Sequence, residues 1–203
     1  MSNNHQWKLI EGYEDWKIYP VYQVFYIESI KSSAESAIYS WEQINNIVTD
    51  TELLKTEAIK LIDLSENIVN QSGIISRYFF PSRDNRNSEK NRIHQLRGEK
   101  LRSIYSIDED NILTNRKFRN FIEHFDENLD QFFNRSVAGQ IIPKTIYWNS
   151  SDISSVTYLF KAYVIQDYKF ISLSQEIELP KLVEEIYRIY NLSLDILEYK
   201  ITS

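Results

Sequence analysis

Apolar residues recur at every third or fourth position through most of residues 20–134, which is the spacing of helices that bury one face. The spacing predicts a long helix over about residues 20–48 and a second over about residues 51–80, ending before Pro81. A third helix is expected between the polar loop 82–88 and the acidic turn 108–110.

A fourth helix, over about residues 114–134, has the clearest apolar stripe in the chain. The stripe consists of Phe118, Phe121, Ile122, Phe125, Leu129, Phe132 and Phe133. On a helical wheel these side chains all lie within about 60° of Phe118. We therefore expect this helix to pack against the other three.

The pattern changes after Gly139, where β-branched and aromatic residues become frequent. Strands are expected over residues 145–148 and 156–164, with a turn at 166–167 that leads the second strand into residues 168–173. Pro180 is suited to the first turn of a final helix.

These elements predict a mainly α fold, in which a four-helix bundle precedes a small C-terminal β-hairpin and a helix. Residues 1–19 are rich in Trp and Tyr and are expected to form an aromatic N-terminal arm. Residues 20–135 would form the bundle, and residues 136–203 the appendage.

Composition removes several classes of protein. A chain of 203 residues fits one domain with an elaboration, and zero cysteines exclude disulfides, Cys-ligated zinc and a thiol nucleophile.

No apolar run approaches the roughly 20 residues that cross a bilayer, and the N-terminus lacks a signal-peptide pattern. We therefore expect a cytoplasmic protein with no membrane partner. No glycine-rich phosphate loop, H-E-x-x-H or G-x-S-x-G motif is present, so nucleotide-cofactor, zinc-protease and serine-hydrolase chemistry are not expected.

Charge is distributed unevenly along the chain. The net charge of −6 argues against non-specific binding to a nucleic-acid backbone, which depends on Lys and Arg. Residues 77–102, however, carry eight basic and three acidic side chains. A local basic patch is therefore expected on an acidic molecule.

The fourth helix carries polar residues opposite its apolar stripe. They are Arg116, Arg119, Asn120, Glu123, His124, Glu127 and Asp130. Within this face the sequence runs R-N-x-x-x-H from Arg119 to His124.

At Arg119, Asn120 and His124 the sequence resembles the HEPN superfamily of helical-bundle proteins, whose motif places an Arg, a polar residue and then a His on the last long helix. The order of four helices over about residues 20–135 agrees with this resemblance. It implies a metal-independent RNA endonuclease of toxin or phage-defence type, with these three residues at the active site and no cofactor. It also implies a homodimer and, for a toxin, an antitoxin or other partner protein.

The residue types suit this chemistry. RNA can be cut by attack of its own 2′-OH on the neighbouring phosphorus, which needs proton transfer near neutral pH and positive charge on the phosphate. A histidine with a pKa near 6.5 can move the proton, and an arginine fork matches the phosphate oxygens. Arg119 and His124 lie about 140° apart on one helix, so two helices facing each other across a twofold axis would combine Arg from one copy with His from the other. Arg116, Arg97 and Arg102 are the residues that we expect to contact RNA.

The same residues allow a second interpretation. Arg119 with Glu123, and Asn120 with His124, are i,i+4 pairs of the kind that decorate a solvated helix face. The chain would then be a non-catalytic helical bundle that binds a protein partner. A di-iron site is not expected, because Phe121 stands three positions before His124, where such sites need Glu.

Overall fold

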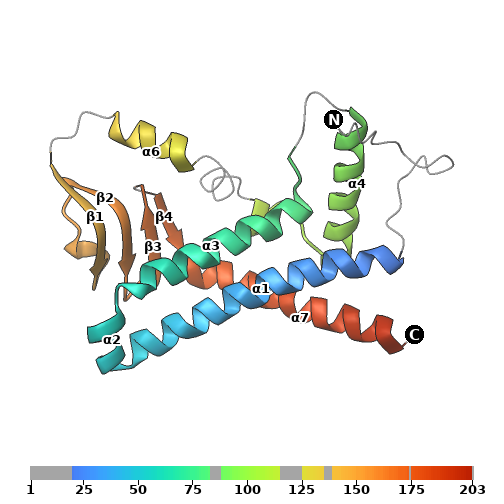
Figure 1. The fold of residues 1–203 in the computed structure, drawn as a ribbon, viewed down its shortest axis with the longest axis horizontal. Helices are drawn as coiled ribbons and strands as arrows, with labels where there is room; N and C mark the ends of the chain where they lie inside the picture. The colour runs from blue at the N-terminus through green and yellow to red at the C-terminus, as the bar shows by residue number, and fades with distance from the viewer. Residues whose placement is uncertain (1–19, 83–87, 115–124, 135–138, 174, 203) are drawn as a thin grey trace, which may run out of the picture.

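Three long helices form the main body and share one hydrophobic core (Figure 1). The computed structural model describes residues 20–82, 88–114, 125–134, 139–173 and 175–202. Helices α1 (Pro20–Thr49) and α3 (Lys60–Phe79) run in opposite directions and are linked by α2 (Thr51–Glu57), while α7 (Leu179–Thr202) packs along α1. The fully buried core side chains include Ile27, Ile30, Ile44, Leu61, Ile62, Ile68, Ile75, Leu182, Ile186 and Ile189.

The helical spacing of the sequence is confirmed for the first and last helices, which are α1 and α7. The helix expected over residues 51–80 is present as two, because the chain turns at Ala58 and Ile59 between α2 and α3. The Asp50 carboxylate caps α2, accepting hydrogen bonds from the backbone N–H groups of Glu52 at 2.8 Å and Leu53 at 3.1 Å.

The third expected helix is also confirmed, as α4 (Ser88–Tyr105), which packs across the C-terminal end of α3 at the end of the body away from the sheet (Figure 1). Gly98 allows this close approach, because a Cβ atom there would lie 2.7 Å from the Phe79 carbonyl oxygen. The buried Tyr105 ring packs edge-on against Phe79, and its hydroxyl lies 2.9 Å from Ser193 Oγ on α7. Helix α4 is thus fixed to both α3 and α7.

The β-rich region forms a four-stranded sheet in the order β1 (Gln140–Tyr147), β2 (Thr157–Val164), β3 (Lys169–Ser172) and β4 (Gln175–Glu178). Strands β1 and β2 are parallel, whereas β2/β3 and β3/β4 are antiparallel. The expected hairpin is therefore only the β2/β3 part of a larger sheet. The hydropathy pattern missed β4 because Ile177 is its only apolar residue, and it does not reveal strand direction.

The sheet docks on the helical body through one of its faces. The paired residues Tyr163 and Phe170 point into the main core, whereas their neighbours Ala162 and Ile171 belong to a separate cluster on the other face. Lys161 Nζ lies 2.7 Å from Glu66 Oε1 on α3 and so adds an ion pair to this contact.

The expected four-helix bundle is not confirmed. Of the predicted fourth helix, the described part is α6 (Phe125–Phe133), and its Phe132 is buried with Leu173 beside the sheet, in a cluster apart from the main core. The place of a fourth core helix beside α1 and α3 is taken by α7, which the sequence pattern had assigned to an appendage. Phe125, Leu129 and Phe132 of α6 pack in one cluster with Tyr158 and Phe160 of β2 instead.

Among the described helices, none combines the length and the apolar character that crossing a membrane requires.

Candidate functional site

Four of the six predicted site residues, Arg116, Arg119, Asn120 and His124, lie outside the described residues. The segment that carries them joins two described elements, the 3₁₀ helix η1 (Ile112–Thr114) and α6. The other two, Arg97 and Arg102, lie on α4 and line two different cavities.

The element that precedes the motif segment is held firmly in place. Leu113 is buried, and its carbonyl oxygen accepts a hydrogen bond from Ser76 Oγ on α3 at 2.7 Å. Asn111 donates from Nδ2 to Glu185 Oε1 on α7, also at 2.7 Å. Thr114, the last described residue before the segment, is therefore anchored to two helices of the main body.

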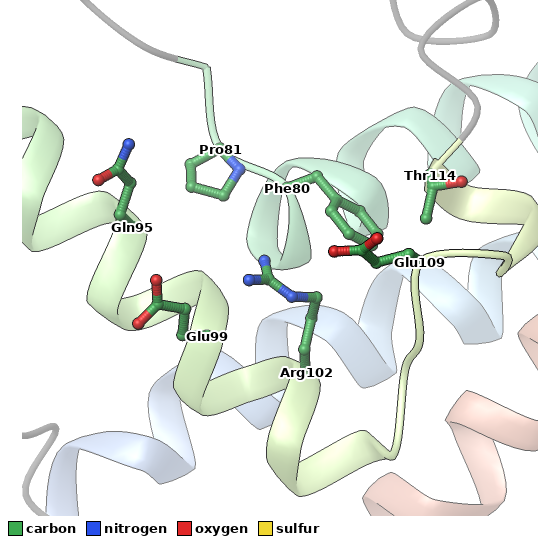
Figure 2. A pocket seen from close by; sticks show the side chains of 7 residues that line it. All are labelled: Phe80, Pro81, Gln95, Glu99, Arg102, Glu109 and Thr114. Carbon is green, nitrogen blue, oxygen red and sulfur yellow. The ribbon is translucent and has the colours of Figure 1, made fainter.

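Thr114 and Arg102 line the same cavity, which has a volume of about 400 Å³ (Figure 2). The lining residues come from the end of α3, from α4 and from the connection that follows α4: Phe80, Pro81, Gln95, Glu99, Arg102, Glu109 and Thr114. The Arg102 guanidinium lies in the middle of this set, donates a hydrogen bond to the Phe79 carbonyl, and sits 5.1 Å from the centre of the Phe80 ring. The basic helix thus reaches the residue that stands five positions before Arg119.

The charge of this cavity is mixed. Arg102 is accompanied by the carboxylates of Glu99 and Glu109, so the lining side chains do not add up to a positive surface. Arg102 offers donors, whereas Gln95 and the two Glu offer acceptors. Such a set suits a polar group that both donates and accepts hydrogen bonds better than a bare phosphate.

Arg97 lines a second cavity, of about 310 Å³, together with Ile74, Arg77 and Tyr78. Its guanidinium lies between two aromatic rings, with Cζ 5.9 Å from the centre of the Tyr26 ring and 5.8 Å from that of Tyr78. Nη2 donates to the Arg77 carbonyl oxygen at 3.2 Å, while the buried Nε has no acceptor in the part of the chain that the structure describes. Burial lowers the pKa of Arg97, and the two tyrosines oppose this shift.

Sequence reasoning selected Arg97 only as part of a basic segment and missed this aromatic setting. Tyr26, Tyr78 and Arg97 are far apart in the chain and come together through the packing of α1, α3 and α4. The only signal in the sequence was the pair Arg77-Tyr78 at the end of a predicted helix.

A third polar cluster joins η2 (Ser150–Asp152) to β3. Ser150 Oγ donates to Asp167 Oδ2 and lies 3.4 Å from Lys169 Nζ. A Ser–Lys pair can act as a nucleophile and base only if the lysine is neutral. Here the hydrogen bond from Lys169 to Glu176 raises the pKa of the lysine, which therefore stays protonated and cannot activate Ser150.

Within the described ranges, no three His, Cys, Asp or Glu side chains are grouped so that they could hold a metal ion. Comparisons of the chain with models of protein families, with curated proteins and with solved structures found no match.

Proposed function

We propose that this protein is a metal-independent RNA endonuclease of the HEPN type, acting in a toxin or phage-defence system. In this proposal His124 transfers the proton, Arg119 stabilises the charge on the phosphate, and Asn120 positions the reacting groups. The observation that carries the proposal is the R-N-x-x-x-H run from Arg119 to His124, since a titrating imidazole and a guanidinium are the two groups that RNA self-cleavage needs.

The surroundings of the motif segment support the proposal. The segment begins directly after Thr114, which shares a cavity with Arg102 of the basic helix α4. An RNA strand that reaches the motif would thus pass beside the part of the chain richest in arginine and lysine, residues 77–102. The donors and acceptors of this cavity suit the edge of an unpaired base.

A HEPN-like arrangement of the helices is part of the same proposal. In favour of this part of the proposal, α1, α3 and α4 follow one another in the order expected for the first three helices, with the short α2 between α1 and α3. Of the predicted fourth helix the described part is α6, which packs beside the sheet.

The chemistry is tested by cutting RNA in the presence of EDTA. We expect the wild type to cleave single-stranded RNA, and we expect a substrate with 2′-O-methyl groups at every position to resist cleavage, because the attacking hydroxyl is blocked. Arg119→Ala should lower the rate by about 10²- to 10³-fold, as loss of a charge-stabilising donor does. Cleavage that EDTA abolishes, or equal cleavage of the methylated substrate, contradicts the mechanism.

The dimer is tested by mixing two inactive variants. If Arg119 of one copy acts with His124 of the other, random exchange of Arg119→Ala and His124→Ala subunits restores one complete site in half of the dimers. The mixture should then reach about a quarter of the wild-type rate. If both residues act from the same chain, mixing restores no cleavage activity, and the proposal that two copies share one site is wrong.

A second candidate function, a non-catalytic interaction module, is favoured by exposed apolar side chains near the outer edge of the sheet. Phe133 at the end of α6 is 61% exposed, and Ile141 on β1 and Val156 before β2 are 51% and 57% exposed. Such residues mark contact surfaces when they gather in one patch. A wild type that does not cleave RNA but binds a protein partner, with binding lost in Ile141→Lys, would assign this edge to the second function.

A further inference from the structure

The guanidinium of Arg97 is a partly buried positive charge. In the described part of the chain no carboxylate pairs with it, and its contacts are one backbone carbonyl and two tyrosine rings. A buried charge is costly unless a partner of opposite charge or a set of hydrogen bonds compensates it. Arg97 has only part of this compensation, because its buried Nε finds no acceptor among the described residues.

The cavity beside Arg97 could hold an anion from solution, which would provide the counter-charge. It has a volume of about 310 Å³, and its walls are Ile74, Arg77, Tyr78 and Arg97. A second guanidinium, that of Arg77, therefore lines the same space, and none of the described lining residues carries a carboxylate.

We propose that this cavity binds a phosphate group. Guanidinium forks match the tetrahedral oxygens of phosphate through paired charge-assisted hydrogen bonds, and the two arginines approach the space from neighbouring helices. The Arg97 guanidinium would donate to one phosphate oxygen through a terminal N–H group. The two tyrosine rings hold the Arg97 guanidinium in place, so little side-chain freedom is lost on binding.

This inference deepens the proposed function. It rests on that function for the claim that the phosphate belongs to RNA. The site would then hold a phosphate of the substrate strand on the α3/α4 side of the molecule. Binding of the phosphate group itself does not depend on catalysis, so the two claims can fail separately.

The first experiment measures the binding of inorganic phosphate at constant ionic strength. The readout is the Nε–H resonance of Arg97 in ¹H–¹⁵N spectra, assigned by its loss in Arg97→Lys. We expect phosphate to move this resonance in the wild type. Arg77→Gln should raise the Kd for phosphate by about tenfold or more, as loss of one charge-assisted fork does.

Two features make this variant informative. Arg77 supports Arg97 through its backbone carbonyl, which the substitution leaves in place, and its side chain is exposed, so the fold should survive. Lys100→Gln removes the same charge from an exposed position on α4 that does not line the cavity, and its Kd should stay within about twofold of the wild type. Equal effects of Arg77→Gln and Lys100→Gln, or an Arg97 resonance that phosphate does not move, overturn the proposal.

The second experiment identifies the source of the phosphate with RNA oligonucleotides that differ only in a 5′-phosphate, bound to the His124→Ala variant. Tighter binding of the phosphorylated strand, weakened by Arg77→Gln, assigns the site to a strand terminus. Equal binding of both strands, weakened equally by Arg77→Gln, assigns it to the phosphodiester backbone. If inorganic phosphate binds and neither strand does, the phosphate site stands and the ribonuclease proposal fails.

Discussion

Arg97 of α4 donates a hydrogen bond from Nη2 to the backbone carbonyl of Arg77, near the end of α3, at 3.2 Å. This hydrogen bond provides a donor for a carbonyl oxygen in the last turn of α3. It also holds the guanidinium beside the cavity that Arg97 lines. Two tyrosine rings fix it there. Arg97 is thus part of the α3/α4 contact as well as a source of charge.

Loss of the hydroxyl group should change the free energy of unfolding differently at two buried tyrosines. Tyr105→Phe removes a buried hydrogen bond to Ser193 and should lower the free energy of unfolding by about 1 kcal/mol. Tyr163→Phe removes a buried hydroxyl that has no hydrogen-bond partner among the described residues, and should leave this free energy unchanged or raise it. Urea unfolding measures both, with Tyr39→Phe, at a 62% exposed position, as the control. Destabilisation by Tyr163→Phe as large as that by Tyr105→Phe would contradict these environments.

Stability should fall at alkaline pH. Burial raises the pKa of Tyr105 to about 12 and also raises that of Tyr163, against an ordinary value near 10 for an exposed tyrosine. The unfolded state therefore loses these protons first, so their contribution is complete below about pH 10 and is lost as pH rises through the folded-state pKa. The free energy of unfolding should decline from pH 10 upward, and less steeply in Tyr105→Phe. An identical decline in that variant would show that Tyr105 does not titrate as described.

Gly98→Ala should destabilise the protein although alanine favours helices. The added Cβ would lie 2.7 Å from the Phe79 carbonyl oxygen and 2.8 Å from Pro81 Cδ, so α4 must move away from α3. Overpacking of this kind costs about 1–3 kcal/mol, which exceeds the helix-propensity gain of about 1 kcal/mol. Thermal unfolding measures the sum, with the exposed Lys100→Ala on the same helix as the control. A stabilised Gly98→Ala protein would mean that the two helices are less closely packed.

The sequence predicted where the helices and strands lie better than it predicted which of them pack together. The apolar positions of α1, such as Ile27, Ile30 and Ile44, are buried where the helical spacing placed them. The stripe that ends in Phe132 and Phe133 predicted a helix, but spacing does not say what the stripe packs against, and Phe132 lies beside the sheet while Phe133 is 61% exposed.

The strands show the same limit. Strand β1 pairs in parallel with β2, a direction that alternation alone does not encode, and β4 exists because its backbone pairs with β3 rather than because its sequence is apolar. At the candidate site, the basic segment predicted charge near Arg97, whereas the aromatic contacts with Tyr26 and Tyr78 arise from tertiary packing. The motif from Arg119 to His124 remains a prediction from sequence.

The most direct test of the central claim is the rate of RNA cleavage in EDTA by the wild type and by His124→Ala, purified side by side, with His5→Ala as a matched histidine control. The account predicts that His124→Ala lowers the rate by about 10²- to 10⁴-fold, because the proton-transfer group is lost, while His5→Ala keeps the wild-type rate. Circular dichroism of all three proteins should coincide. Equal cleavage by the wild type and a folded His124→Ala variant would contradict the account.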